Sequence, residues 1–409
     1  MQTIEFFFDF TCPYAYLAST QVEGIATRTG APLKWRPMLL GGVFRALDVP
    51  QVLFKTLSPS KAQHNFADMV RWADFWGVPL SMPSGHPYRS VEALRAVLSL
   101  PEELRPPVIH GLFRAYWVLG LDIAEKSVIE GVLRDCGVPL EHAGPFDQEV
   151  KDALRIETEE AIQRGVFGAP AVFLGDELYW GQDRLWMVEE ALGGTFPHPK
   201  PELTELPQQD LKFYFDISSP FAFLAAEALT DWSAENGVNV HWKPIFLGGL
   251  FKSLGGPTAP LVTFSPSKQK YVFKELHRWA AHRSVPLNWP SRFPMLTIKA
   301  MRILLSLGDR CTPLALRLFR AYWVEDLDIK EDEVLAKLLA EMEFPPETLN
   351  AASDPHWKQA LIDATAEAQA AGVFGVPTFE VGTSLIWGQD RFLFVEGVLN
   401  GWKDPGARQ

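Results

Sequence analysis

Residues 6–16 read Phe-Phe-Phe-Asp-Phe-Thr-Cys-Pro-Tyr-Ala-Tyr, and residues 213–223 read Phe-Tyr-Phe-Asp-Ile-Ser-Ser-Pro-Phe-Ala-Phe. Each stretch begins with a short aromatic and apolar run, which is typical of a buried strand. A proline follows Cys12 in the first stretch and Ser219 in the second. Because proline is tolerated in the first turn of a helix, we predict a strand, a sharp turn and a helix in both stretches.

The second stretch repeats the first, and other motifs repeat with it. Cys12 matches Ser219 at a shift of 207 residues, and the Trp-Gly-Gln-Asp-Arg motif that begins at residue 180 returns at residue 387 with the same shift. Repeats of about 200 residues have the size of whole domains and exceed the roughly 20–50 residues of stacked repeat units. We therefore predict two fused copies of one domain.

The pattern around these motifs gives the domain organisation. We expect the first domain at residues 1–197 and the second at residues 210–409. Four prolines and several charges at residues 196–207 favour an extended linker, which we place at 198–209. Residues 58–165 and 265–372 are rich in helix formers with apolar residues at three- and four-residue spacing, so we predict that each domain contains a helical insertion.

Shorter patterns predict the remaining elements of each domain. A second strand is expected at residues 33–36 and 238–243, and a β-hairpin at residues 171–180 and 378–387. A closing helix is expected at residues 185–192 and 392–399. Each domain is therefore expected to have an α/β fold.

Composition and charge limit the possible partners. The 409-residue chain is 47% hydrophobic and has a formal net charge of −12. Nucleic acids and anionic membranes both favour proteins with fields of lysine and arginine, so we exclude them as partners and expect a small-molecule substrate. No apolar run approaches the roughly 20 residues needed to cross a bilayer.

The cysteines and the first residues of the chain bear on its location. The first residues carry no basic segment followed by an apolar segment, so we expect no signal peptide. Cys12, Cys136 and Cys311 occupy positions that do not match between the repeats, which argues against a disulfide framework. We expect a cytoplasmic protein.

Cys12 and Ser219 are the leading candidates for chemistry. At a strand-to-helix turn, unpaired backbone N–H groups and the helix dipole stabilise negative charge. Cys12 is therefore expected to have a depressed pKa, and Ser219 could donate a hydrogen bond to a thiolate brought by a ligand. The alternatives are a buried inert thiol for Cys12 and a plain helix N-cap for Ser219.

Two further motifs supply polar groups near the end of each repeat. A cis peptide at Ala169-Pro170 or Val376-Pro377 would expose backbone for an extended peptide ligand, whereas a trans proline could simply begin the strand. Gln182 and Asp183, like Gln389 and Asp390, could hold an ammonium and a carboxylate, or could cap the last helix and pair with arginine. Both interpretations are open for both motifs.

Taken together, these motifs resemble a known family. Asp-x-x-Ser-Pro, Gly-Gly-x-Phe, the lysine of Ser-Pro-Ser-Lys, Gly-Val-Phe-Gly-Val-Pro-Thr-Phe and Trp-Gly-Gln-Asp-Arg are similar to motifs of 2-hydroxychromene-2-carboxylate isomerases and kappa-class glutathione transferases. The resemblance spans nearly all of both halves. It implies two tandem thioredoxin-like domains, each with an inserted all-helical subdomain of the DsbA type. Val49 and Gly256 stand where these families usually carry an asparagine.

The resemblance also implies a cofactor and a role for each site residue. Glutathione would bind in the C-terminal half, with its thiolate accepting a hydrogen bond from Ser219. Val376 beside Pro377 would bind the cysteinyl backbone, Gln389 and Asp390 the γ-glutamyl end, and Lys268 the glycyl carboxylate or the substrate. The matching residues of the first half are carried over in the same way: Lys61, Ala169, Pro170, Gln182 and Asp183.

Three functions remain as hypotheses. The first is a glutathione-dependent isomerase or transferase acting on a small hydrophobic or aromatic electrophile. The second is a DsbA-like thiol-disulfide oxidoreductase that uses Cys12 alone, since Cys-Pro-Tyr-Ala lacks a second cysteine. The third is a non-catalytic binding module.

Other kinds of site and assembly were also considered. No nucleotide motif is present, and His64, His86 and His110 lack metal-ligand spacing, so we expect no metal or nucleotide and interpret these histidines as solvated or capping. Because a symmetric interface can survive fusion, we also expect the halves to form an intramolecular pseudo-dimer.

Overall fold

The computed structural model describes residues 2–50, 56–198 and 210–408. These residues form two compact units. The N-terminal unit comprises Met1–Leu57 and Met69–Pro199, and the C-terminal unit comprises Ser58–Asp68 and Lys200–Gln409. Residues 199–209 of the predicted linker lie outside the described residues.

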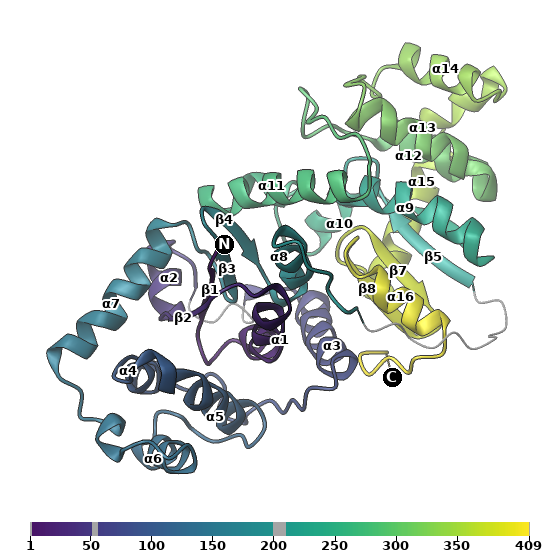
Figure 1. Ribbon diagram of the computed structural model, residues 1–409. Helices are drawn as coiled ribbons and strands as arrows, with labels where there is room; N and C mark the ends of the chain where they lie inside the picture. Colours follow the sequence, from purple (N-terminus) through teal and green to yellow (C-terminus); the bar gives the residue numbers. More distant parts are fainter. Residues whose placement is uncertain (1, 51–55, 199–209, 409) are drawn as a thin grey trace. The chain divides into compact units, whose positions relative to one another are not determined.

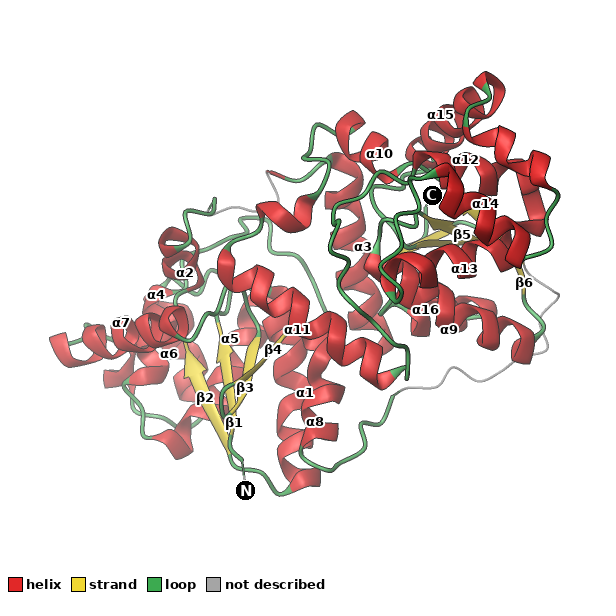
Figure 2. Cartoon of the chain, turned by 90° about the horizontal axis from the view of Figure 1, so that it is seen from above, coloured by secondary structure: helices red, strands yellow, loops and turns green. Residues whose placement is uncertain are grey.

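The N-terminal unit is built on a four-stranded sheet in the order β2-β1-β3-β4 (Figure 2). Its central strand β1 pairs with β2 in parallel and with β3 antiparallel, and β3 pairs with β4 antiparallel, as predicted for the hairpin. The bounds are β1 (Ile4–Phe8), β2 (Leu33–Pro37), β3 (Ala171–Leu174) and β4 (Glu177–Trp180).

The C-terminal unit repeats this sheet in the order β6-β5-β7-β8. The register is the same, since Phe213 lies opposite Trp242 in the second sheet as Phe6 lies opposite Trp35 in the first. The predicted duplication and fold class are thus confirmed at the level of strand pairing. The bounds are β5 (Asp210–Phe215), β6 (Asn239–Pro244), β7 (Thr378–Val381) and β8 (Ser384–Trp387).

A helix follows the first strand of each sheet and carries the Cys-Pro or Ser-Pro motif at its start. Helix α1 (Pro13–Thr29) and helix α9 (Pro220–Asn236) both have proline in the first turn and end at a glycine with positive φ, Gly30 or Gly237. Only glycine adopts that conformation without steric cost, which explains why both helices stop there. Shorter helices follow the second and fourth strands: α2 (Leu40–Ala46), α8 (Leu185–Ala191), α10 (Leu247–Ser253) and α16 (Phe392–Leu399).

A set of helices separates the second and third strands of each sheet, as the sequence predicts (Figure 1). Their apolar residues recur at helical spacing, and each helix buries one face, as expected for amphipathic helices. In the first repeat they are α3 (Pro59–Phe75), α4 (Val91–Leu98), α5 (Arg105–Trp117), α6 (Lys126–Asp135) and α7 (Gln148–Gln163). In the second they are α11 (Pro266–His282), α12 (Ile298–Leu307), α13 (Thr312–Trp323), α14 (Asp332–Glu341) and α15 (Pro355–Ala370).

The division into units differs from the predicted domains at one helix. The sequence assigns residues 58–165 to the first domain, but Ser58–Asp68, the first part of α3, belongs to the C-terminal unit. The remainder of α3 belongs to the N-terminal unit. Sequence patterns locate this helix, but they carry no signal for the unit in which its first residues pack.

Aromatic side chains fill the core of each unit. Trp117 and Trp323 are fully buried, and their indole N–H groups donate to the carbonyls of Phe10 and Ile217, each at 2.8 Å. A buried tryptophan needs such an acceptor because an unpaired N–H in the core is costly. The helical insertion is thereby attached to the residues that follow the first strand in both repeats.

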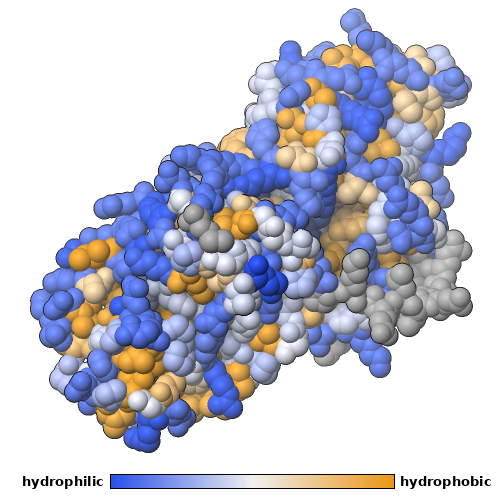
Figure 3. All heavy atoms as spheres, in the orientation of Figure 1, coloured by the Kyte–Doolittle hydropathy of each residue, from blue (hydrophilic) through white to orange (hydrophobic). Residues whose placement is uncertain are grey.

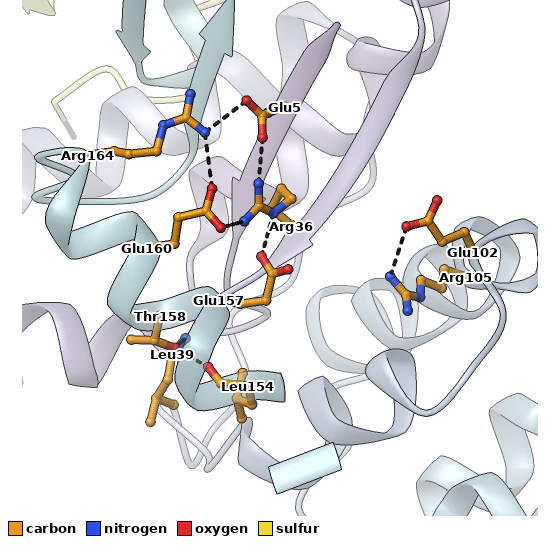
Figure 4. Close-up of polar contacts among 10 residues, drawn as sticks. All are labelled: Glu5, Arg36, Leu39, Glu102, Arg105, Leu154, Glu157, Thr158, Glu160 and Arg164. Atoms are coloured by element: carbon orange, nitrogen blue, oxygen red, sulfur yellow. Dashed lines mark hydrogen bonds and ion pairs between the residues drawn. The ribbon is translucent and has the colours of Figure 1, made fainter. Parts of the chain in front are cut away.

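An ionic cluster around the buried Arg36 connects β1, β2 and α7 in the N-terminal unit (Figure 4). The guanidinium of Arg36 bonds the carboxylates of Glu5, Glu157 and Glu160, although its side chain is only 3% exposed. Arg164 also donates to Glu5, at 2.8 Å. Burial acts to lower the pKa of Arg36, but the bonds to Glu160 and Glu157 raise it above its ordinary value.

Hydrophilic and apolar side chains are mixed on the surface. On the face drawn in Figure 3, hydrophilic and hydrophobic residues are interspersed. Among the described residues, no helix combines the length and hydropathy needed to cross a bilayer. Single exposed apolar side chains, such as Leu119 and Leu296, are normal on a protein surface.

Candidate functional site

The turn between the first strand and its helix is held by a buried aspartate in each unit. Asp216 accepts hydrogen bonds from the backbone N–H groups of Ser218 and Leu247, at 2.9 and 2.8 Å, and from the hydroxyl of Thr297. In the N-terminal unit, Asp9 likewise accepts from the backbone of Thr11. Burial raises the pKa of both carboxyls, and these hydrogen bonds oppose that effect.

Cys12 and Ser219 occupy equivalent backbone positions at this turn. Both are N-cap residues in extended conformation, with φ and ψ of −95° and 115° for Cys12 and −98° and 118° for Ser219. The Ser219 hydroxyl accepts from the backbone N–H of Ala222 at 3.1 Å, as an N-cap serine should. The Cys12 side chain makes no such capping bond.

The structure brings each of these residues to the predicted proline motif. Cys12 Sγ donates to the carbonyl of Ala169 at 3.1 Å, and Ser219 Oγ donates to the carbonyl of Val376 at 3.3 Å. The Ala169-Pro170 and Val376-Pro377 peptide bonds are both cis. Residues 157 positions apart in the sequence therefore form one site in each unit.

The expected depression of the Cys12 pKa is wrong. Burial, with 7% of the residue exposed, raises the pKa of the Cys12 thiol to about 12. The backbone N–H groups of Ala15 and Tyr14 lower the pKa, and the charge of Asp9 raises it. The cost of removing a thiolate from water therefore exceeds the stabilisation that the start of α1 provides.

The Gln-Asp-Arg segment lies beside the proline motif in both units. In the C-terminal unit the backbone N–H of Gly388 donates to the carbonyl of Pro377 at 3.0 Å, and Gly181 donates to Pro170 in the same way. Arg283 donates to the carbonyls of Leu224 and Gln389, at 2.8 and 2.7 Å, and so connects this segment to α9. Ser219 and Gln389 thus belong to the same candidate site.

The polar side chains of this segment differ in whether they have a hydrogen-bond or ion-pair partner. Gln389 is 2% exposed, and its Oε1 atom has no hydrogen-bond partner among the described residues. The matching Gln182 is also buried, and its Nε2 atom has no partner within the same set. Asp390 pairs with Arg391 at 2.9 Å, and Asp183 pairs with Arg184 at 3.0 Å, so the arginine pairing considered above is present.

The two predicted lysines both belong to the C-terminal unit. Lys268 lies near the start of α11, and its Nζ atom is 4.3 Å from the centre of the Phe264 ring. Burial lowers the pKa of Lys268 to about 8, and the charge of Lys61 adds to this effect. Burial also lowers the pKa of Lys61. Lys61, expected at the Cys12 site, is therefore placed in the unit that contains Ser219.

Three residues of the C-terminal unit were not predicted to contribute to this region. Asp68 accepts from Arg391, and Arg283 supports Gln389 as described above. His64 was predicted to be solvated or capping, but it is only 8% exposed. Its ring lies 5.2 Å from that of Phe374. Arg283 matches Trp76 in the first repeat, so the repeats give no signal for it.

Other parts of the N-terminal unit do not add to the site. A cavity of about 420 Å³ is lined by residues of α1, β2 and α5, including Trp35 and Arg105, and by none of the predicted site residues. Glu102 lies 3.9 Å from Arg105 at its edge (Figure 4). Within residues 2–50, 56–198 and 210–408, no group of His, Cys, Asp and Glu side chains is arranged to hold a metal ion.

Comparison with known proteins gives one family and several relatives. Residues 3–193 and residues 210–400 each match the family described as DSBA-like thioredoxin domain. A 2-hydroxychromene-2-carboxylate isomerase of Sphingobium xenophagum is 28% identical over 201 residues, which cover 47% of this chain and 98% of that protein. Glutathione s-transferase kappa 2 of Caenorhabditis elegans is 27% identical over 223 residues, which cover 49% of this chain and 96% of that protein.

Similar chains are also found among solved structures. A 2-hydroxychromene-2-carboxylate isomerase has 28% sequence identity and a TM-score of 0.43, with coverage of 47% of this chain and 94% of that one. Each relative thus matches about half of the chain. The two matches to the family description account for both halves, in agreement with the predicted duplication.

Proposed function

Because the chain belongs to the DSBA-like thioredoxin domain family, we propose that its C-terminal unit is a glutathione-dependent isomerase or transferase of the 2-hydroxychromene-2-carboxylate isomerase and kappa type. The substrate would be a small hydrophobic electrophile. One observation carries the proposal: the Ser219 hydroxyl lies at the start of α9 and donates to the carbonyl of Val376, beside Pro377. This places a hydrogen-bond donor and the positive end of a helix dipole together.

The residues of the C-terminal unit fit a glutathione molecule. Gln389 has a buried side-chain oxygen without a partner among the described residues, which suits the ammonium of a γ-glutamyl group. Asp390 would share that ammonium, and the backbone of Val376 would pair with the cysteinyl residue. Lys268 would hold the glycyl carboxylate or the substrate. Gly256 offers no side-chain amide at the position where the related families usually carry an asparagine.

The chemistry of this site follows from its electrostatics. Bound glutathione would supply a thiolate nucleophile. Ser219 would turn its hydroxyl from the Val376 carbonyl toward the sulfur and donate a hydrogen bond, while α9 would stabilise the negative charge. The side chains that hold the peptide would fix the position of the sulfur relative to the substrate.

The matching residues of the first repeat are part of the same proposal. Ala169, Pro170, Gln182 and Asp183 would form the corresponding binding framework in the N-terminal unit, but Cys12 replaces Ser219 there and Lys61 belongs to the other unit, so we expect this framework to bind glutathione much more weakly than the C-terminal site. The pKa of about 12 for Cys12 argues against the alternative of a thiol-disulfide oxidoreductase, because the thiolate is the nucleophile in disulfide exchange. A non-catalytic binding module remains the alternative if no turnover is found.

Calorimetric binding of reduced glutathione tests the proposal directly. We expect the wild type to bind glutathione. The Ser219→Ala substitution should raise the pKa of the bound thiol by about 1–2 pH units, since a hydrogen bond to a charged group is worth about 1.5–3 kcal/mol. The ultraviolet absorbance of the thiolate measures that pKa. Cys12→Ala is the matched control and should leave the pKa unchanged. Absence of binding at millimolar glutathione would refute the proposal.

Two further properties complete the proposal. We propose that the two units form an intramolecular pseudo-dimer, which the duplication supports because symmetric interfaces are common among homologous chains. Small-angle scattering from the whole chain would refute this if it showed two domains that do not contact each other. We also propose a cytoplasmic location, which the free state of Cys12, Cys136 and Cys311 supports.

A further inference from the structure

The cavity of about 420 Å³ in the N-terminal unit lies beside an edge of the sheet. Among the described strands, β2 pairs with β1 alone, so β2 is an edge strand. Leu33, Lys34 and Trp35 all line the cavity, although successive side chains of a strand point to opposite faces. The cavity therefore borders the edge of β2 rather than one face of the sheet.

The backbone of β2 offers hydrogen-bonding groups on this side. The carbonyl of Pro32 accepts from the N–H of Ile4 at 2.8 Å and is therefore directed toward β1. Because the backbone groups of successive residues in a strand alternate in direction, those of Leu33 and Trp35 are directed away from β1. An edge of this kind can accept the backbone of an extended peptide.

Arg105 presents a charged donor at the same cavity. Its Nε and Nη2 atoms donate to the carbonyls of Leu100 and Leu98, at 3.0 and 3.4 Å, which holds the guanidinium in place. Its Nη1 atom lies 3.9 Å from Glu102 Oε1, beyond hydrogen-bond distance (Figure 4). The Glu102 side chain is 73% exposed. A ligand carboxylate can therefore take the place of Glu102 and form charge-assisted hydrogen bonds with Arg105.

Part of the cavity wall is apolar. Ala26, Leu33, Trp35 and Pro106 contribute to this part. The indole of Trp35 is held by an edge-to-face contact with Phe6, at 5.2 Å between the ring centroids. Such a wall suits an aromatic side chain, because aromatic rings gain from both apolar burial and ring-to-ring contact.

The second repeat does not carry this combination. In this stretch the repeats are related by a shift of 206 residues, so Arg105 matches Cys311, which is fully buried. The short 3₁₀ helix at Gly308–Cys311 packs against the edge strand β6, where His241 lies 3.9 Å from Asp309. The cavity and its arginine thus distinguish the N-terminal unit from its copy.

We propose that this cavity binds a short free peptide that ends in an aromatic residue. The terminal carboxylate would bind Arg105, the last side chain would pack on Trp35, and the peptide backbone would extend along the edge of β2. The volume is near the lower end of the range for small-ligand sites, about 300–1,000 Å³, and so suits a ligand of two or three residues. This inference is independent of the proposed glutathione function, because every residue that it uses lies in the N-terminal unit.

Calorimetry of the full-length chain with glycyl-alanyl-phenylalanine tests the inference. We expect this peptide to bind, and its C-terminal amide to bind at least tenfold more weakly because the amide cannot form the charged pair with Arg105. Glycyl-alanyl-alanine lacks the aromatic ring, and 3-phenylpropanoate lacks the peptide backbone. Both should also bind at least tenfold more weakly.

Three variants assign the binding to this cavity. Arg105→Met should remove the preference for the acid, so that acid and amide bind with equal affinity. Arg155→Met removes an exposed arginine of the same unit and should leave the preference unchanged. Glu102→Gln serves if Arg105→Met fails to fold. Loss of this competing, mostly exposed carboxylate should strengthen binding of the acid about two- to fivefold and leave binding of the amide unchanged.

The opposite results would overturn the proposal. Acid and amide that bind equally to the wild type, or an Arg105→Met variant that keeps the preference, would exclude Arg105 as the carboxylate site. Equal affinity for 3-phenylpropanoate would show that the cavity recognises an aromatic acid and would refute the peptide assignment. Absence of peptide binding at millimolar concentration would refute the site itself. Arg105→Met should leave glutathione binding unchanged, which separates this test from that of the C-terminal site.

Discussion

Cys12 and Ser219 share a backbone conformation but offer a ligand different groups. Ser219 accepts from the start of α9 and has a hydroxyl proton directed at the Val376 carbonyl. Cys12 is a neutral thiol at neutral pH, because burial raises its pKa to about 12. A buried neutral thiol is a weak hydrogen-bond donor and a poor nucleophile. The C-terminal repeat therefore has a hydrogen-bond donor for a ligand thiolate. The N-terminal repeat has a sulfur atom in its place, but this sulfur is unreactive at neutral pH.

The reactivity of Cys12 can be predicted from this pKa. At pH 7.5 we expect iodoacetamide to modify Cys136, which is partly exposed, well before Cys12. The rate at Cys12 should rise about tenfold per pH unit and show no midpoint below pH 10, because only the thiolate fraction reacts. Mass spectrometry of the Cys12 peptide measures this rate.

The control for this experiment is Cys12→Ser, in which labelling of Cys136 should be unchanged. A rate at Cys12 that levels off near pH 7 would mean that the thiol has a depressed pKa. The redox hypothesis would then regain support.

Residue roles could be predicted where both repeats carry the same motif. The approach of Ser219 to the Val376-Pro377 peptide follows from matched motifs in both halves. The pKa of Cys12 could not be predicted, because its sign depends on burial by residues far away in the sequence. Asp68 was missed because its partner Arg391 lies 323 positions later and pairs with it only through folding.

At the scale of elements, the ionic cluster around Arg36 distinguishes two otherwise equivalent sheets. Arg36 matches Lys243 in the second repeat, and Glu5 matches Lys212. In the second sheet, Glu380 of β7 instead accepts a hydrogen bond from the Tyr214 hydroxyl of β5 at 2.7 Å. Strand pairing is thus preserved between the repeats while the polar contacts beside it have changed.

We predict that Arg36→Met strongly destabilises the N-terminal unit. Its removal leaves Glu5, Glu157 and Glu160 close together with less compensating positive charge. These carboxylates are 20–41% exposed and Arg164 still pairs with Glu5, so the free energy of unfolding in urea should fall by about 1.5–3 kcal/mol, less than for a fully buried ion pair.

Arg155→Met in helix α7, the helix that carries Glu157 and Glu160, is the matched control. Arg155 also pairs with two carboxylates, those of Asp152 and Glu159, but on the surface, so its loss should leave the unfolding midpoint unchanged. Equal effects of the two substitutions would show that the burial of Arg36 does not determine how much its cluster contributes to the free energy of unfolding.

The elements themselves could be predicted well because their patterns are local. Aromatic runs, an N1 proline and a terminal glycine predict the first strand and its helix in each repeat. The unit to which an element belongs is not a local property. The first part of α3 lies in the sequence of the first repeat but packs on Phe374 and Trp387 of the second.

At the scale of the whole molecule, the duplication has left two sites with unequal groups. Only the C-terminal unit combines a Ser219-type hydroxyl with both predicted lysines, Lys61 and Lys268. The N-terminal unit has the same backbone framework at Cys12 and Ala169. The family resemblance carries site residues over to both halves, whereas the groups present favour the C-terminal site.

We therefore predict that the full chain binds one glutathione. In calorimetry the stoichiometry should be one per chain, and Ser219→Ala should weaken that single site without exposing a second. Cys12→Ser, which gives the N-terminal turn the side chain found in the C-terminal one, should raise the stoichiometry toward two, with the new site weaker because Lys61 lies in the other unit. Two sites of equal affinity in the wild type would show instead that the neutral thiol of Cys12 can replace the hydroxyl of Ser219. The serine would then not be the reason that glutathione binds in the C-terminal unit.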